Sequence, residues 1–168
     1  MSKAVLISSS LSADSHSAKL IRAAAKRLQE QGGEIEIIDL KKQNIPFCDA
    51  RPLADYPDHI QDLFTQIDTA DYLVFGFPIY CYSISGVLKN FLDIFSHAMK
   101  GKRFGICAAA GSKLSYLATA DLHKIMSFQS NAVGIHPAVF ADCSDFEDDV
   151  PNKAIQERID RMLEELLK

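Results

Sequence analysis

Five short apolar segments recur along the chain, each followed by small or polar residues or by proline. Unbroken apolar runs of this length are typical of parallel strands that are covered on both faces. The second segment differs, because Glu34 to Ile38 alternates polar and apolar residues, which predicts a strand near a sheet edge. The five predicted strands span residues 4–7, 34–38, 72–77, 104–109 and 138–141.

Helical patterns fill the intervals after these strands. The first predicted helix begins near Ser17 and ends at Gly32-Gly33, since glycine adopts the left-handed conformation that closes a helix. In the five helices the apolar residues recur mostly three or four positions apart. These residues are Leu20, Ile21, Ala24 and Leu28; Ile60, Leu63, Phe64 and Ile67; Val87, Leu88, Phe91, Leu92 and Phe95; Leu117, Leu122, Ile125 and Met126; and Ile155, Ile159, Met162, Leu163 and Leu166.

Strict alternation of strand and helix predicts one α/β domain over residues 1–168. It favours parallel strands with right-handed crossovers and helices on both faces of the sheet. Five repeats are too few for an eight-stranded barrel, so we expect an open five-stranded sheet of order 2-1-3-4-5. The long connection over residues 41–57 carries three prolines and is a candidate lid or oligomer contact.

Composition narrows the range of functions. The net charge of −4 is mild and the Lys and Arg residues are scattered, so nothing indicates nucleic-acid binding. No apolar run approaches the roughly 20 residues of a membrane span, and the apolar start is too short for a signal peptide, so we expect a cytoplasmic protein. The four cysteines form no C-x-x-C pair, so we expect no metal site.

In a sheet of this order, ligands bind beyond the carboxyl ends of strands one and three. The first strand is followed by a hydroxyl-rich loop, residues 8–17, that leads into a helix N-terminus. Free backbone amides, the helix dipole and serine hydroxyls suit a phosphate group. A purely structural role is the alternative, because Ser15 or Ser17 would cap the helix without any ligand. The loop has no Lys or Arg, and neither a G-x-G-x-x-G nor a P-loop motif occurs.

Two further loops are expected at the same edge. Pro78 predicts that the third strand ends there, and Tyr80 and Tyr82 then present aromatic surface that suits a flat ligand. After the fourth strand, residues 108–112 are small, which lets the backbone approach a ligand closely. For this last loop a simple turn without function remains an alternative.

These loops together resemble the NADPH-dependent FMN reductase family of flavodoxin-like proteins. The segment "ISSSLSADSHS" is similar to the family's first phosphate loop, and "PIYCYSISGVLKNFLD" resembles its signature P-x-Y-x-x-S-x-x-G-x-L-K-N-x-x-D. The residues in register with that signature are Pro78, Tyr80, Ser83, Gly86, Leu88, Lys89, Asn90 and Asp93.

The resemblance implies a flavodoxin-like fold, an FMN cofactor, NADPH or NADH as electron donor, and a homodimer or homotetramer. Hydride would pass from the nicotinamide to flavin N5, and electrons then to a small acceptor such as a flavin, quinone, azo compound or oxidised metal ion. It assigns no catalytic residue on the protein. The residues implied to bind the cofactor are Ser10, Ser12, Ser15 and Ser17 at the phosphate, and Pro78, Ile79, Tyr80, Cys81, Tyr82, Ser83, Ala110, Gly111 and Ser112 around the ring.

Several positions depart from the family pattern. Ser12 stands where the family usually has arginine, while Ser9 and Ser17 replace glycine and asparagine. Cys81 and Tyr82 replace the asparagine and glycine that are usual beside the ring.

Three other functions compete with a reductase. Cys81 could be a nucleophile at the end of a central strand, although its tyrosine neighbours do not suit a tight nucleophile elbow. An FMN-binding electron carrier of the flavodoxin type shares the predicted cofactor, but such carriers have strongly acidic docking faces. A phospho-acceptor signalling domain would need an aspartate where this chain has Phe75 to Pro78.

Overall fold

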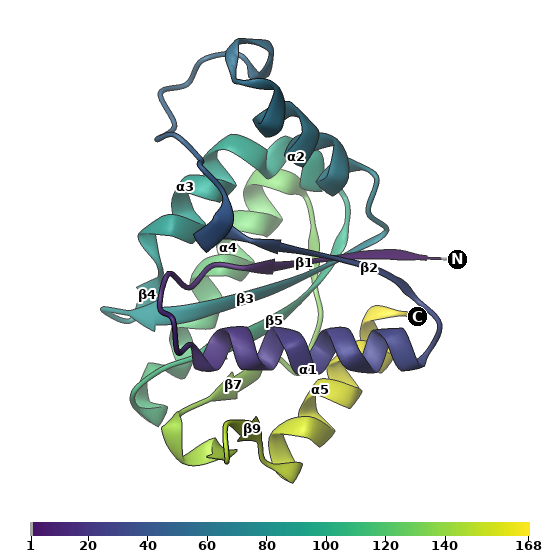
Figure 1. Cartoon of the computed structure of the whole chain (residues 1–168), viewed down its shortest axis with the longest axis vertical. Helices are drawn as coiled ribbons and strands as arrows, with labels where there is room; N and C mark the ends of the chain where they lie inside the picture. Colours follow the sequence, from purple (N-terminus) through teal and green to yellow (C-terminus); the bar gives the residue numbers. More distant parts are fainter. Residues whose placement is uncertain (1) are drawn as a thin grey trace.

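The computed structural model describes residues 2–168 as a twisted sheet between two layers of helices (Figure 1). The central strands run in parallel in the order β2-β1-β3-β5-β6, with β7 also on β5. This arrangement confirms the predicted order 2-1-3-4-5. The strand bounds are β1 Lys3–Ser8, β2 Glu34–Asp39, β3 Tyr72–Tyr80, β4 Ser83–Ile84, β5 Arg103–Ala109, β6 Val133–Gly134 and β7 Val139–Ala141.

Each face of the sheet has its own core. Helices α1 (His16–Glu30) and α5 (Lys153–Leu166) cover one face, while α2 (Asp58–Asp68), α3 (Gly86–Phe95) and α4 (Thr119–Ser130) cover the other. Along β1, Val5 and Ile7 enter the core under α2 and α3, and Ala4 and Leu6 enter the core under α1 and α5. A central strand needs apolar residues on both sides, which explains the unbroken run.

The fifth predicted strand forms in two pieces. β6 and β7 both pair with β5, and residues 135–138 between them, including Pro137, leave the ladder. Two short hairpins were not predicted. β4 pairs antiparallel with the end of β3, and β8 (Phe146–Glu147) pairs with β9 (Val150–Pro151) apart from the main sheet. The sheet therefore has seven strands, and five strand positions form its main path, as predicted.

The prediction that the third strand ends at Pro78 is wrong. β3 continues to Tyr80, and Pro78 pairs with Ala109 of β5. The Gly76 carbonyl points toward the β1 side and accepts a hydrogen bond from the Ser9 amide. Backbone groups alternate sides along a strand, so the Pro78 nitrogen also faces β1, which has already ended at Ser8. A proline at such an open edge loses no ladder hydrogen bond.

The fourth helix also begins later than its apolar pattern predicts. A 3₁₀ segment, η4 (Lys113–Ala118), precedes α4, and Leu117 is exposed on it instead of packing in the core. The 3₁₀ turn rotates Leu117 out of the stripe that Leu122 and Met126 form on α4.

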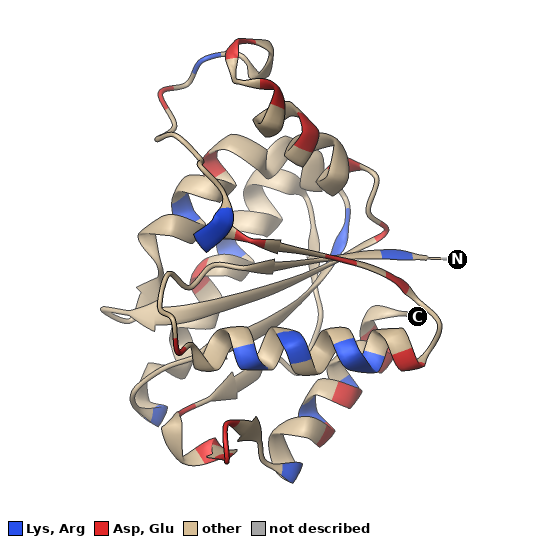
Figure 2. Cartoon of the chain, in the orientation of Figure 1, with Lys and Arg blue, Asp and Glu red and all other residues tan. Residues whose placement is uncertain are grey.

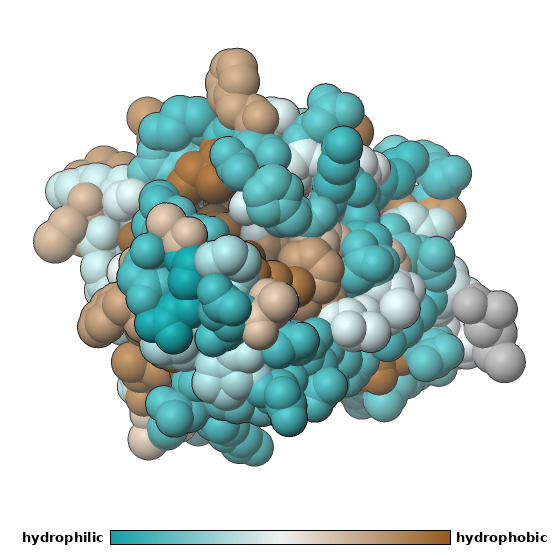
Figure 3. Space-filling view, turned by 90° about the horizontal axis from the view of Figure 1, so that it is seen from above, coloured by the Kyte–Doolittle hydropathy of each residue, from teal (hydrophilic) through white to brown (hydrophobic). Residues whose placement is uncertain are grey.

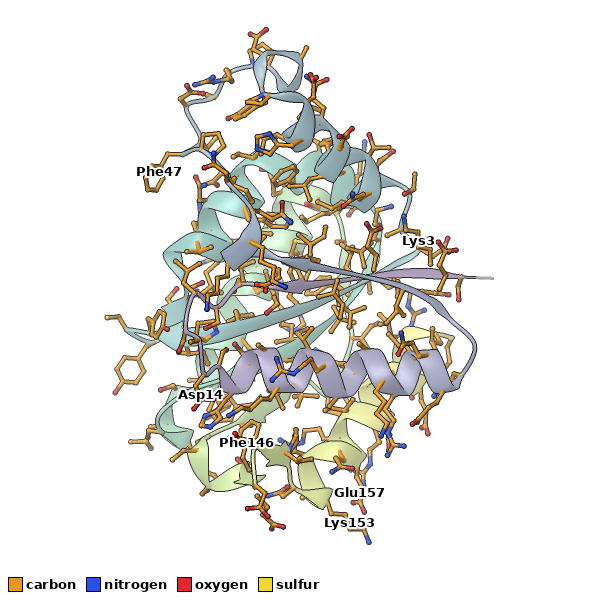
Figure 4. The ribbon with its side chains drawn as sticks, in the orientation of Figure 1. Lys3, Asp14, Phe47, Phe146, Lys153 and Glu157 are labelled. Carbon is orange, nitrogen blue, oxygen red and sulfur yellow. The ribbon has the colours of Figure 1, made fainter. Side chains whose placement is uncertain are left out.

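The long connection after β2 contains two 3₁₀ turns, η1 (Leu40–Lys42) and η2 (Leu53–Asp55). Asn90 of α3 holds it in place: the side-chain amide donates to the Pro46 carbonyl at 3.0 Å, and the side-chain oxygen accepts from the Cys48 amide at 2.9 Å. Phe47 between them points outward and is 88% exposed (Figure 4). Nothing in these contacts shows the connection to be a lid or an oligomer contact.

Over α2 and this connection the surface is mostly hydrophilic, with hydrophobic side chains in separate patches (Figure 3). Among the helices of residues 2–168, none is long and apolar enough to cross a membrane.

Candidate functional site

A cavity of about 320 Å³ lies at the carboxyl ends of β1, β3 and β5, where parallel sheets of this order bind ligands. Its volume falls within the usual range of small-molecule clefts. Three loops that are far apart in the sequence meet there. The lining residues are Ser10, Ser12, Asp14, Ser15, His16, Ser17, Pro78, Ile79, Tyr80, Ala109, Ala110, Gly111 and Cys143.

The loop after β1 is held by its own hydroxyl groups. The Ser10 Oγ accepts from the Ser12 amide at 3.3 Å, and the Ser12 hydroxyl donates to the Asp14 carbonyl at 2.9 Å. The Ser15 and Ser17 hydroxyls lie 3.1 Å apart, and Ser15 Oγ accepts from the Ala18 amide as the N-cap of α1. The capping role proposed for Ser15 is therefore real, and it leaves the amides of His16 and Ser17 without a partner inside the helix.

The charges near this loop are dominated by carboxylates. Lys19 of α1 is only 7% exposed, and its Nζ lies 2.5 Å from Asp14 and 2.6 Å from Asp149. The hydrogen bond from Lys19 lowers the pKa of Asp14, so this carboxyl stays ionised. One lysine cannot neutralise two carboxylates, so the three groups together carry net negative charge.

The loop after β3 is a tight hairpin that joins β3 to β4. Cys81 and Tyr82 form its turn with φ of 50° and 59°, in the left-handed region that favours glycine and asparagine. Tyr80, just before the turn, and Tyr82, within it, are 57% and 69% exposed. This position gives Cys81 an exposed turn instead of the strand-to-helix elbow that a nucleophile would need.

A hydrogen bond anchors the hairpin to α4. The Ser83 hydroxyl donates to Asp121 Oδ2 at 2.7 Å, and this bond is the main cause of the lowered pKa of Asp121. Ser83 therefore serves the hairpin itself, and it does not line the cavity.

The third loop closes the opposite side. The Ala110 amide donates to the Ala141 carbonyl at 3.0 Å, which ties the end of β5 to β7. A methyl group placed on Gly111 would meet nothing within 4 Å, so open space adjoins this residue. Ser112 caps η4 through the Leu114 amide and does not line the cavity.

Most of the predicted residues thus meet at one cavity, and four do not line it. Cys81, Tyr82, Ser83 and Ser112 lie outside the lining because the hairpin turn and the start of η4 carry them past it. Sequence reasoning missed Asp14, His16, Ala109 and Cys143. Asp14 and His16 lie inside the quoted serine loop, whereas Cys143 follows β7 and has no sequence signal. His16 stacks on Phe146 at 4.3 Å between ring centroids, which positions its ring.

Comparison with known proteins decides the family. A family model described as NADPH-dependent FMN reductase matches residues 2–146. The chain belongs to the NADPH-dependent FMN reductase family. Membership confirms the predicted enzyme class, an FMN-dependent oxidoreductase that uses NAD(P)H.

Individual relatives agree with this family. The chain is 28% identical over 137 residues to an NAD(P)H-dependent FAD/FMN reductase of Geobacillus thermodenitrificans, covering 80% of this chain and 74% of the relative. It is 31% identical over 118 residues to an FMN-dependent NADPH-azoreductase of Staphylococcus saprophyticus, covering 67% and 63%. The crystal structure of an apo NADH:FMN oxidoreductase superposes with a TM-score of 0.79 at 25% identity, covering 96% and 88%.

The cavity fits the cofactor of this reductase family. One end offers serine hydroxyls, among them Ser10, and the amides at the start of α1, which can donate to a phosphate. The other end offers Pro78, Tyr80 and the small residues 109–111, which leave room for a flat ring. The donors are neutral dipoles, because among the described residues no lysine or arginine lines the cavity.

Proposed function

We propose that this reductase holds FMN in the cavity between the loops after β1, β3 and β5. It would pass electrons from NADPH or NADH to a small acceptor: a flavin, a quinone, an azo compound or an oxidised metal ion. One observation carries the proposal. A phosphate-binding end and a flat, partly aromatic wall share one cavity, at the sheet edge where this fold binds ligands.

Each loop has a distinct task in this proposal. Ser10, Ser12, Ser15 and Ser17, with the first amides of α1, would hold the phosphate. Pro78, Ile79 and Tyr80 would line one side of the ring, and Ala110 and Gly111 the other.

The hairpin residues Cys81, Tyr82 and Ser83 lie next to this wall. They would contact the ring only at its edge, as would Ser112. These four assignments are weaker than the others, because the residues lie beyond the cavity lining.

The bound flavin would supply the redox chemistry, accepting hydride and releasing electrons. The chain's own residues need only orient the donor and the acceptor against it. We therefore assign no catalytic acid or base to the protein. The exposed tyrosines of the hairpin offer stacking surface for an aromatic acceptor.

An electron carrier of the flavodoxin type is a poorer interpretation. Such a carrier would need a strongly acidic docking surface, and the net charge of −4 is mild. The relatives from Geobacillus and Staphylococcus are both named as reductases.

We further propose a cytoplasmic homodimer or homotetramer. Apolar side chains crowd the exposed segments beside the cavity, which supports assembly there: Tyr80, Tyr82, Leu114, Tyr116 and Leu117. All four cysteines are free, which is consistent with a reducing compartment.

An absorption spectrum of the purified protein, before and after addition of FMN and gel filtration, tests the cofactor. We expect a bound oxidised flavin band, and consumption of NADPH or NADH when a quinone, an azo dye or free flavin is present. Absence of a flavin band after FMN addition would contradict the proposal. Bound flavin without nicotinamide oxidation would favour the carrier.

A further inference from the structure

The charges around the phosphate end of the cavity are unusual for a site that should attract a phosphate dianion. Among residues 2–168, the fully charged side chain that lines this cavity is the carboxylate of Asp14. His16 is the other ionisable group at that end. Asp14 stands at the beginning of α1 (Figure 4), the position at which a bound phosphate would meet the helix dipole.

The nearby cations offset this carboxylate only in part. Lys19 is shared between Asp14 and Asp149, and both carboxylates are largely exposed, at 78% and 77%. Figure 2 marks further Lys and Arg residues along α1. Arg22 and Lys26 line a separate cavity between α1 and α5, although Arg22 also helps to lower the pKa of Asp14. Within residues 2–168, no lysine or arginine lines the flavin cavity itself.

We propose that Asp14 sets the flavin specificity of this site. Its carboxylate weakens binding of the FMN phosphate, so the site accepts riboflavin, a flavin without phosphate, almost as well as FMN. This inference rests on the proposed function, because it assumes that the flavin phosphate occupies the serine loop.

Simple electrostatics gives the direction and the scale. A divalent phosphate within one Debye length of an exposed carboxylate is repelled, while the helix N-terminus and the hydroxyls attract it. Removing the carboxylate should strengthen FMN binding on the order of threefold to tenfold. Riboflavin carries no charge, so its affinity should stay the same.

The chain offers a matched control for this charge. Asp149 pairs with the same ammonium group as Asp14 but lines the cavity between α1 and α5 instead of the flavin cavity. Asp149→Asn removes one carboxylate partner of Lys19, just as Asp14→Asn does. Asparagine also tolerates the φ of 67° at this position. An effect specific to the flavin cavity should therefore be larger in Asp14→Asn than in Asp149→Asn.

The experiment measures the dissociation constants of FMN and riboflavin by quenching of flavin fluorescence. We compare the unmodified protein, Asp14→Asn, Asp149→Asn and Ser12→Arg, each checked for folding by thermal unfolding. In the unmodified protein FMN should bind less than about tenfold more tightly than riboflavin. Asp14→Asn and Ser12→Arg should each increase this preference by about threefold or more, through tighter FMN binding alone.

Three results overturn the inference. The first is a preference of the unmodified protein for FMN of a hundredfold or more. The second is a preference that Asp14→Asn leaves unchanged, and the third is an equal response to Asp149→Asn. In these cases both flavins still bind, so the proposed function survives. Binding of neither flavin to any of the four proteins would instead contradict the proposed function, and the inference with it.

Discussion

The loop after β1 and the hairpin after β3 border the same cavity, yet they are built in opposite ways. In the first loop Ser10, Ser15 and Ser17 are buried, and their hydroxyls satisfy the loop and the helix that follows. In the hairpin, Cys81 and Tyr82 adopt left-handed backbone conformations, and the tyrosine side chains are exposed. Side-chain hydrogen bonds within the loop hold the first loop, whereas the hairpin is held by the pairing of β3 with β4 and by a side-chain bond to α4.

This contrast suggests a division of work. The phosphate of FMN presents one fixed geometry, so a rigid loop suits the phosphate end. The hairpin exposes Tyr80 and Tyr82 beside the cavity, and under the proposed function its residues would change this surface without disturbing the phosphate end. Four substitutions test this division, beginning with the largest expected effect.

Gly76→Ala should disrupt the rigid side of the site. A methyl group at Gly76 of β3 would collide with the Ile21 side chain and lie 3.2 Å from the Ser17 carbonyl oxygen. We expect the free energy of unfolding to fall by about 2–3 kcal/mol, measured by urea denaturation. Gly111→Ala is the control, because open space surrounds that position. Equal losses in the two variants would show that the clash is relieved by small movements.

Ser15→Ala should weaken both the helix and the phosphate end. Loss of the N-cap should cost about 1 kcal/mol of stability, and loss of a hydroxyl donor should weaken FMN binding about tenfold. Fluorescence titration with FMN measures the second effect. Asn152→Ala removes the side-chain cap of α5, outside the cavity lining, and should cost stability with FMN affinity unchanged. If Asn152→Ala weakens FMN binding as much, the effect comes from general loss of stability.

Tyr82→Gly should stabilise the protein, because it relieves the backbone strain of the hairpin. Glycine at φ 59° avoids a cost of about 1 kcal/mol that other residues pay there. Thermal or urea unfolding should therefore show a gain of about that size, with FMN affinity nearly unchanged. Tyr116→Gly, at an exposed tyrosine without a positive φ, should give no gain. A loss of stability in Tyr82→Gly would mean that the tyrosine side chain makes contacts that outweigh the strain.

Cys81→Ser should have the smallest effect. The thiol is exposed at the hairpin turn and lies outside the cavity lining, so nicotinamide oxidation should change by less than about twofold. Steady-state rates with NADPH and a quinone measure this. A variant that binds FMN normally and loses activity would show that the thiol takes part in the reaction.

The architecture of this protein follows from local patterns along the chain. Helix and strand periodicities are local. The apolar run around Leu6 therefore predicts a buried strand, and the stripe from Leu20 to Leu28 predicts a helix and its buried face. Their alternation then leaves few possible topologies, and the order 2-1-3-4-5 placed the serine loop, Pro78 and Gly111 at one edge.

Other details depend on which segments become neighbours when the chain folds. Pro78 stays in β3 because β1 ends beside it, and Cys143 joins the cavity because β7 carries it to β5. The role proposed for Asp14 depends on its contact with Lys19, which also binds Asp149. Lys19 and Asp149 lie more than a hundred residues apart in the sequence. Such contacts produce no periodic pattern in the sequence, because they depend on which segments pack against each other in the folded chain.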